Sequence, residues 1–402
     1  MLAGTISAVR GGAKRKGESL QNDTATARGN WKPVKPVPAA PRRLDGAAGR
    51  GHPRRMGLTI DLAAIAANWK ALAARAPGAR PGAVVKADAY GLGAARVAPA
   101  LYAAGARHFF VALAAEGRAI RPLLGDDASI FVLSGLMPGQ DLTGLIPVLN
   151  SAEQFFRDRA LRPRGGFAIQ LDSGMNRLGM EPAEWAAIRA EALSARTAAG
   201  QGPALVMSHL MCADEPGHPA NAAQLAAFRE MAMGVTAPLS LSATGGILLG
   251  ADYHFDVTRP GIGLYGGDPF AEARPVVTLA LEVIQTRTVA AGEAVGYGCT
   301  WTAARPSRIA TLAAGYADGL LRALSGKSVP LWAGDRSAPI VGRVSMDLIT
   351  VDVTDLPDVP AALEILNARQ TVDDLAARAG TIGYEILTSL GPRYPRDWRA
   401  AE

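Results

Sequence analysis

Short apolar runs alternate with alanine-rich stretches of helical period through the central part of the chain. Apolar residues recur at every third or fourth position from Leu62 to Leu72, which predicts a helix that Asp61 caps and Pro77 ends. Eight later runs are candidate strands: Ala83–Lys86, His108–Ala112, Ile130–Leu133, Ile146–Leu149, Phe167–Asp172, Ala204–His209, Leu239–Ala243 and Val257–Tyr265. Most are almost continuously apolar, which is typical of parallel strands covered on both faces.

Eight strands that alternate with helices over roughly 220 residues favour an α/β fold, a (β/α)8 TIM-like barrel. A doubly wound open sheet is the alternative, because local patterning does not count strands reliably. The character of the sequence changes after about residue 275, where short strands are separated by Gly, Pro and Asp turns. These strands are Val276–Arg287, Val289–Val295, Ser307–Ala313, Val329–Leu331, Ile340–Val344 and Leu348–Val353, with a short helix at Thr371–Gly380. They predict a mostly β C-terminal domain.

The charge is distributed unevenly along the 402 residues. The formal net charge is +6, but residues 1–55 hold 12 Lys or Arg against 3 Asp or Glu, and the rest holds 30 against 33. The basic excess therefore belongs to the N-terminal segment, and the body lacks the footprint of a nucleic-acid binder. We predict a disordered basic tail at 1–56, a barrel at 57–285 and a β-rich domain at 286–402. The tail is either a plain solvated segment, with Met56 a plausible true start, or a basic arm for an anionic surface.

Composition narrows the class of protein. Hydrophobic residues make up 49% of the chain and charged residues 19%, enough for a sizeable core. No apolar run reaches the roughly 18 residues of a membrane helix. The two cysteines, Cys212 and Cys299, do not make a disulfide framework, and no Cys/His cluster has zinc spacing. We expect a cytoplasmic protein with no metal and no membrane or nucleic-acid partner.

Candidate chemistry gathers where the predicted strands end, the edge that carries active sites in barrels. Lys86 ends the first strand. In one interpretation, desolvation lowers the pKa of its amine, which then acts as a nucleophile that can form a Schiff base with an aldehyde. In the other, the side chain simply extends to solvent at the barrel rim. Arg177 is either a carboxylate or phenolate clamp or a surface arginine. His209 is either a ligand or a satisfied core histidine.

Two glycine-rich loops follow the last predicted strands. Ser242 precedes Gly245 and Gly246, and Arg259 precedes Gly261 and Gly263. Such turns can present N–H groups to a phosphate, although either loop alone is an ordinary connector. Together with Lys86 they suggest a phosphorylated aldehyde, and pyridoxal phosphate fits.

Six motifs in this order resemble those of alanine racemases, pyridoxal-phosphate enzymes of fold type III. They are Val85–Gly91, Asp172–Gly179, Arg259–Gly266, Gly296–Gly298, Gly315–Gly319 and Met346–Asp347, and the resemblance spans about residues 57 to 402. It implies an isomerase that interconverts L-alanine and D-alanine by two bases, for peptidoglycan or for catabolism. It also implies a homodimer whose active site is shared between subunits.

The resemblance implies roles for individual residues. Lys86 is the Schiff-base lysine and one base, and Tyr297, from the partner subunit, is the other. The residues implied for the cofactor phosphate are Tyr90, Ser242, Gly261, Ile262 and Tyr384. Arg259 faces the pyridine nitrogen, and His209, also a cofactor-site residue, is either hydrogen-bonded to Arg259 or packed against the ring. Arg177, Met346 and Asp347 lie near the substrate carboxylate.

One position departs from the family pattern. Many members have a carbamylated lysine two residues before Asp172, where this chain has Gln170. A neutral amide can hydrogen-bond Arg177 but supplies no negative charge. We therefore predict no carbamate beside Arg177.

Three other functions are compatible with parts of the pattern. An amino-acid decarboxylase or a broad-specificity racemase shares the two-domain plan, and a non-catalytic pyridoxal-phosphate-binding protein resembles the barrel alone. The Gly296–Gly298 and Met346–Asp347 motifs favour an alanine racemase, and the predicted β domain disfavours a binding protein.

Overall fold

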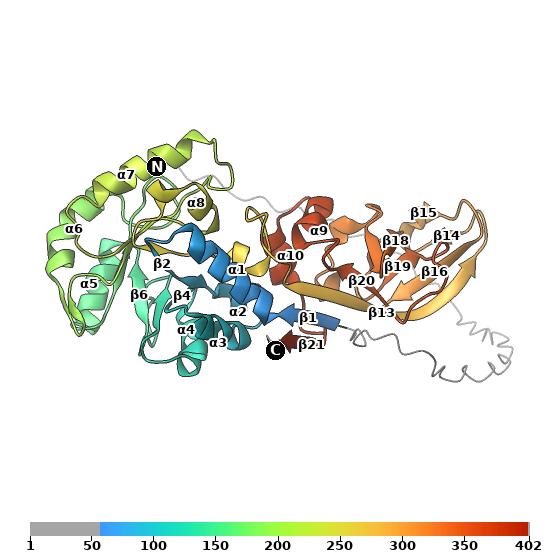
Figure 1. Ribbon diagram of the computed structural model, residues 1–402, viewed down its shortest axis with the longest axis horizontal. Coiled ribbons are helices and arrows are strands. Elements are labelled where there is room, and N and C mark those ends of the chain that lie inside the picture. Colours follow the sequence, from blue (N-terminus) through green and yellow to red (C-terminus); the bar gives the residue numbers. More distant parts are fainter. Residues whose placement is uncertain (1–56, 401–402) are drawn as a thin grey trace, which may run out of the picture. The chain divides into compact units, whose positions relative to one another are not determined.

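The computed structural model describes residues 57–400, and the predicted tail at 1–56 lies outside the described residues (Figure 1). Seven parallel strands form one sheet in the order β11-β10-β7-β6-β5-β4-β3. From β3 onward they are β3 (Ala83–Val84), β4 (His108–Val111), β5 (Ser129–Val132), β6 (Ile146–Leu149), β7 (Ala168–Gln170), β10 (Val206–Met207) and β11 (Leu239–Ser240). All seven were predicted, although most are shorter than the apolar runs.

The eighth predicted strand, β12 (Val257–Thr258), lies between the two edges of this sheet. On one side Arg259 N–H donates to the Ser242 carbonyl at 2.8 Å. On the other side Gly82 N–H donates to the Thr258 carbonyl at 2.8 Å. Because β12 bonds to both edges, the strands form the predicted barrel and not an open sheet.

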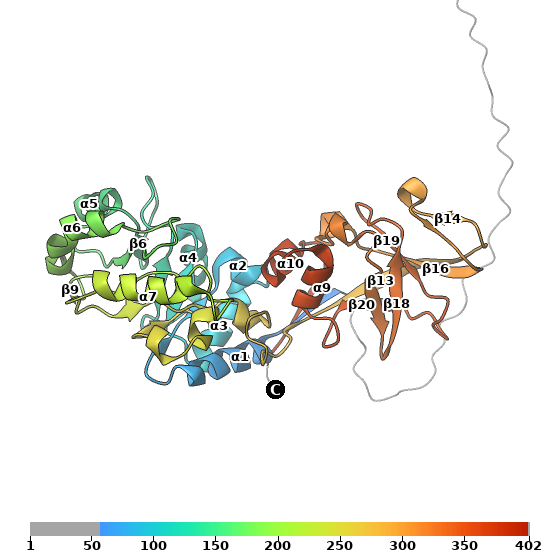
Figure 2. The same ribbon diagram turned by 90° about the horizontal axis from the view of Figure 1, so that it is seen from above.

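Helices pack around these strands (Figures 1 and 2). They are α1 (Leu62–Arg75), α3 (Ala94–Ala104), α4 (Ala114–Ile120), α5 (Ala152–Leu161), α6 (Pro182–Ser194), α7 (Pro219–Met231) and α8 (Thr244–Leu248). In α1 the predicted cap is confirmed, since the Asp61 carboxylate accepts the Ala64 N–H at 2.8 Å. The α1 face with Ile65, Trp69 and Leu72 is buried, as its helical period predicts.

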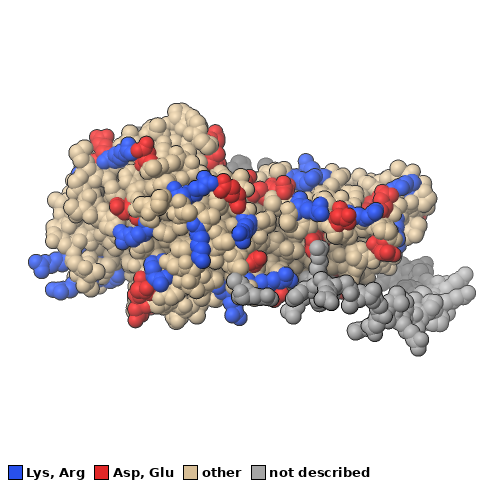
Figure 3. Space-filling model, viewed as in Figure 1, with Lys and Arg blue, Asp and Glu red and all other residues tan. Residues whose placement is uncertain are grey.

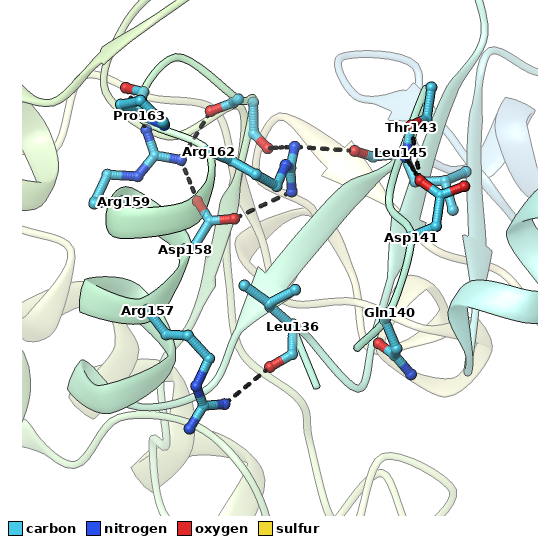
Figure 4. A network of polar contacts seen from close by, with 12 residues as sticks. Leu136, Gln140, Asp141, Thr143, Leu145, Arg157, Asp158, Arg159, Arg162 and Pro163 are labelled. Carbon is cyan, nitrogen blue, oxygen red and sulfur yellow. Dashed lines mark hydrogen bonds and ion pairs between the residues drawn. The ribbon is translucent and has the colours of Figure 1, made fainter. Parts of the chain in front are cut away.

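One buried carboxylate ties α5 to the loops around it (Figure 4). The Asp158 side chain is fully buried and pairs with Arg159 and with Arg162 Nη1, the latter at 3.1 Å. Arg162 also donates to the Gly166 carbonyl, and Arg159 to that of Gly165, just before β7. A buried charge needs such pairing, and here the pairing fixes the approach to β7.

The C-terminal part forms an eight-stranded sheet in the order β16-β19-β18-β17-β20-β13-β1-β21. Its strands are β1 (Gly57–Asp61), β13 (Val277–Val289), β16 (Ser307–Leu312), β17 (Pro330–Ala333), β18 (Arg336–Val341), β19 (Ile349–Asp352), β20 (Ala362–Leu366) and β21 (Arg396–Arg399). The mostly β character is as predicted, and α9 (Val372–Ala379) is the predicted helix. The sequence did not indicate β20, β21 or α10 (Gly383–Ser389).

Three details bear on the predicted boundaries. β1, at the start of the described chain, pairs with β13 and β21 and so belongs to the C-terminal sheet. β13 runs through the predicted boundary between 285 and 286, and the domain limits stay a prediction. The expected strand at 289–295 is wrong, because the chain turns at Gly292 (φ +86°) and resumes as β14 (Ala294–Val295).

On the face of the molecule shown in Figure 3, positively and negatively charged side chains of the described residues are interspersed. This view shows no large basic patch, in line with the charge count of residues 56–402. Within residues 57–400 we find no helix that has both the length and the hydropathy needed to cross a membrane.

Candidate functional site

A cavity of about 970 Å³ lies where the carboxyl ends of the barrel strands meet α9 and α10. Most of the predicted site residues line it: Lys86, Tyr90, Arg177, His209, Arg259, Gly261, Ile262 and Tyr384. Gln170 and Thr244 line it as well. Ser242, Tyr297, Met346 and Asp347 do not line it. The structure therefore brings together residues that are almost 300 positions apart in the sequence.

Lys86 lies two residues after β3 and is the first residue of a short helical turn, α2 (Lys86–Tyr90). Its predicted position inside the strand is thus wrong by two residues. Partial burial lowers the pKa of its amine, and the positive charges of Arg177 and Arg259 lower it further. The Glu116 carboxylate acts in the opposite direction. A lowered pKa makes an unprotonated, nucleophilic amine more available.

Arg259, directly after β12, is almost fully buried (3% exposed), and the acceptors it contacts among residues 57–400 are uncharged. Its Nη1 donates to Ser240 Oγ, and its Nη2 donates to the Ser208 carbonyl at 2.6 Å. Burial lowers the pKa of the guanidinium to about 9, so it remains mostly protonated at neutral pH. The site therefore holds a fixed cation, and no carboxylate of the described part of the chain is bonded to it.

His209 follows β10 and lies next to this cation, with its Nδ1 3.5 Å from Arg259 Nη2. Burial, and then the charges of Arg259, Arg177 and Lys86, lower the pKa of the imidazole to about 3. The ring is therefore neutral at physiological pH and can accept a hydrogen bond from Arg259.

The pKa of His209 predicts a pH dependence of stability. The imidazole pKa is about 3 in the folded chain and roughly 6.5 in an unfolded one. Protonation thus favours unfolding: this contribution is complete above pH ~6.5 and is lost as the pH falls toward 3. We expect His209→Gln to flatten the decline in the free energy of unfolding between about pH 7 and pH 4.5, measured by urea denaturation. An unchanged slope in the variant would contradict a neutral buried ring.

Glycine turns and two tyrosines form another part of the cavity lining. The α8 helix and the short turn η3 (Ile262–Tyr265) both begin there. A Cβ on Gly261 would lie 2.5 Å from Tyr90 Oη, so only glycine lets the turn approach the tyrosine. The Tyr90 ring lies 5.8 Å from that of Tyr384, centre to centre. Backbone N–H groups and phenols at one end of a cavity suit a phosphate.

Thr244 in this region was not singled out from the sequence. Its hydroxyl oxygen accepts the N–H groups of Gly261 at 3.0 Å and Gly263 at 3.3 Å, which joins the two glycine loops. Its place directly before Gly245, at the start of a glycine-rich loop, could have identified it from the sequence. The neighbouring Ser242 hydroxyl instead donates to the Tyr253 carbonyl at 2.6 Å. The phosphate contact of Ser242 stays a prediction.

Three predicted site residues lie on loops of the C-terminal part. Tyr297 begins the turn η4 (Tyr297–Cys299) and is 72% exposed, and Met346 is 54% exposed. The Asp347 carboxylate accepts a hydrogen bond from Arg393 Nη1 at 2.8 Å. Arg393 also binds the buried Asp318 through Nε and Nη2, which anchors this loop surface. Within one chain these residues do not reach the cavity that holds Lys86.

Gln170 and Arg177 line the same cavity, as their sequence positions predicted. Arg177 is exposed and lies in the loop after β7, whereas Gln170 is buried at the end of that strand. Gln170 lacks the amine that a carbamate requires, and the absence of a carbamate stays a prediction. Among residues 57–400 no three His, Cys, Asp or Glu side chains are grouped as metal ligands would be.

Comparisons with known proteins agree over most of the chain. Residues 60–269 match the family "Alanine racemase, N-terminal domain", and residues 276–398 match "Alanine racemase, C-terminal domain". The chain is 61% identical over 347 residues to the alanine racemase of Dinoroseobacter shibae, covering 85% of this chain and 97% of the relative. It is 60% identical over 348 residues to one from Cereibacter sphaeroides, with coverage of 85% and 98%.

Solved structures show the same likeness. The alanine racemase from Bartonella henselae, described with covalently bound pyridoxal phosphate, matches with a TM-score of 0.81 and 37% identity. The match covers 86% of this chain and 100% of that one. The biosynthetic alanine racemase from Pseudomonas aeruginosa matches with a TM-score of 0.77 at 37% identity, with the same coverage.

Proposed function

The chain belongs to the alanine racemase family, and on that premise we propose that it interconverts L-alanine and D-alanine with pyridoxal 5'-phosphate as its cofactor. One observation carries the proposal. A lysine amine of lowered pKa, a buried guanidinium and a glycine-rich turn line a single cavity at the carboxyl ends of the barrel strands. These are the groups that an aldehyde, a pyridine nitrogen and a phosphate require.

The residues of the cavity fit this cofactor. Lys86 would hold its aldehyde carbon, Arg259 would face its ring nitrogen, and Ile262 and Tyr90 would hold its phosphate. The Gly261 N–H already donates to the Thr244 hydroxyl, so its phosphate contact stays a prediction. The approach of Gly261 to Tyr90 leaves no room for a side chain, which is how a backbone reaches close to an anion. A cofactor held by these residues would supply an electron sink for the pair that the substrate's Cα keeps when its proton leaves.

Arg259 limits how strongly that electron pair is withdrawn. A mostly protonated guanidinium can donate to a ring nitrogen but is a poor proton source, so a nitrogen bound there would stay unprotonated. The Ser240 and Ser208 contacts hold the guanidinium in place. Weak withdrawal favours prompt return of a proton to Cα over side reactions.

Racemisation needs a proton taken from one face of Cα and another delivered to the opposite face, which two bases can do. We propose Lys86 Nζ and Tyr297 Oη for these roles. Since Tyr297 is highly exposed and lies outside its own chain's cavity, it would serve the cavity of a second subunit. The proposed assembly is a homodimer with shared sites.

We also propose that Arg177 binds the substrate carboxylate, together with the backbone N–H of Met346 and the Asp347 side chain from the partner. A guanidinium suits a carboxylate because it can donate two parallel hydrogen bonds. The cell would use the activity in the cytoplasm to make D-alanine for peptidoglycan or to degrade it.

The activity is tested directly with purified protein and L-alanine. We expect D-alanine to form and the approach to equilibrium to be the same from either enantiomer, followed by circular dichroism. Release of CO₂ would identify a decarboxylase instead. A protein that binds the cofactor but leaves alanine unchanged would be a non-catalytic binding protein, and comparable rates with larger amino acids would indicate a broad-specificity racemase.

Sharing of the site predicts complementation between two inactive variants. In a heterodimer of Lys86→Ala and Tyr297→Phe chains, one of the two sites has both wild-type residues. Random reassociation of equal amounts should then restore about a quarter of the wild-type activity. If both bases came from the same chain, mixing would restore none.

A further inference from the structure

The backbone directly after Lys86 is left-handed over four consecutive non-glycine residues. Ala87 and Asp88 have φ near +53°, and Ala89 and Tyr90 have φ near +56°. An L-residue in this region is strained, because its Cβ crowds the neighbouring carbonyl, and the strain normally limits such residues to single positions. A run of four persists only when the surrounding structure holds it.

The Glu116 carboxylate holds the beginning of this run. Glu116 lies in the first turn of α4, and its Oε1 accepts the Ala87 N–H at 2.8 Å. Its Oε2 accepts the N–H groups of Ala112 at 2.7 Å and Leu113 at 3.2 Å, where β4 passes into α4. One side chain thus joins the residue next to Lys86 to the neighbouring strand and helix.

The far end of the run is held by a side chain of the run itself. Asp88 Oδ1 accepts the Ala94 N–H at 2.7 Å, at the start of α3. Gly91 and Gly93 follow with positive φ, where glycine carries no strain. At the lysine end, by contrast, the hydrogen bond to the backbone of the turn comes from a different element, through the Glu116 side chain of α4.

We propose that Glu116 is a positioning residue for Lys86, which fixes the left-handed turn so that Nζ meets the cofactor aldehyde and the substrate's Cα. The inference rests on the proposed function and goes beyond it, because Glu116 touches neither the cofactor nor the substrate in that scheme. A small displacement of a reacting group costs up to about 100-fold in rate. The negative charge of Glu116 also opposes the effect of Arg177 and Arg259 on the Lys86 pKa.

The alternative is that Glu116 only caps α4, and two substitutions separate these roles. Glu116→Gln keeps the size but has a single acceptor oxygen, so it loses one set of contacts. Glu116→Asp is too short to reach Ala87 from α4 but can still cap the helix. Asp374 does so at the corresponding position of α9, where its Oδ2 accepts the Thr371 N–H at 2.8 Å.

Glu184→Gln is the matched control. Glu184 also lies in the first turn of a helix, α6, is partly buried, and accepts the N–H of a neighbouring element, Ala152, at 2.8 Å. It does not line the cavity.

The readouts are the rate at which visible absorbance develops when pyridoxal phosphate is added to apoprotein, kcat and KM for alanine, and the urea midpoint. We expect both Glu116 variants to slow cofactor attachment and to lower kcat by roughly 10- to 100-fold, with smaller changes in KM. Glu116→Asp should keep a wild-type urea midpoint, and Glu184→Gln should remain within about twofold in both rates.

Attachment and turnover in Glu116→Asp at the rates of the Glu184→Gln control would overturn the inference and leave α4 capping as the role of Glu116. The inference would also be overturned if, in all three variants, the losses in attachment rate and kcat were proportional to a fall in the urea midpoint. If the wild-type protein neither attaches the cofactor nor racemises alanine, the proposed function fails first and the inference with it.

Discussion

Replacing Lys86 with alanine should abolish both covalent attachment of pyridoxal phosphate and alanine racemisation. In the proposed mechanism one amine does both tasks, and no other side chain that lines the cavity carries an amine. Removing a residue of this kind typically lowers kcat by roughly 10⁴-fold or more. The measurement is intact mass after borohydride reduction, together with the rate of D-alanine formation.

The chain offers a control for this experiment. Residues 57–400 contain two other lysines, Lys70 and Lys327, and Lys70 is exposed on α1. Lys70→Ala should leave both readouts at wild-type levels. Reduction followed by peptide mapping of the wild-type protein should place the added mass on Lys86, and a wild-type rate in Lys86→Ala would refute the assignment.

Tyr297→Phe should block one of the two proton transfers while leaving cofactor attachment intact. The substitution removes the phenol oxygen and little else, and loss of a general base costs about 10²- to 10⁴-fold. In D₂O the variant should exchange the α-proton of one alanine enantiomer without inverting it, because Lys86 still serves one face. Proton NMR of each enantiomer, paired with circular dichroism, separates exchange from inversion.

Tyr102→Phe is the control for Tyr297→Phe. The Tyr102 hydroxyl donates to Asp127 at 2.5 Å on the barrel surface, and the residue does not line the cavity. It should exchange and invert both enantiomers at equal rates. Equal exchange of both enantiomers by Tyr297→Phe would mean that another group is the second base.

Much of the fold followed from local pattern. The barrel strands are buried on both faces, so their sequences are continuous apolar runs that stand out from the alanine-rich helices. β20 and α10 were missed for equally physical reasons. β20 contains the buried Glu364, which interrupts its apolar run, and α10 begins at Gly383, which no helix-start rule favours.

The candidate site was partly visible for a related reason. Because barrels gather the carboxyl ends of their strands, residues such as Lys86, His209 and Arg259 could be grouped by their place in the strand order alone. Ser242 shows the limit of this approach. Its position fits a phosphate contact, but where its hydroxyl points is decided by the Tyr253 carbonyl, which the chain brings up from 11 residues away.

By itself, the sequence determined the alternation of strands and helices, the residues at the strand ends and the family, because these depend on local period and on motifs. Only the tertiary structure decided that Glu116 holds the turn after Lys86, since this contact joins positions 29 residues apart across two elements. For Tyr297, which the family resemblance already implied for a partner's site, the structure added that the side chain is exposed and outside the cavity of its own chain, because the path of a chain in space depends on packing between distant segments and not on any local pattern.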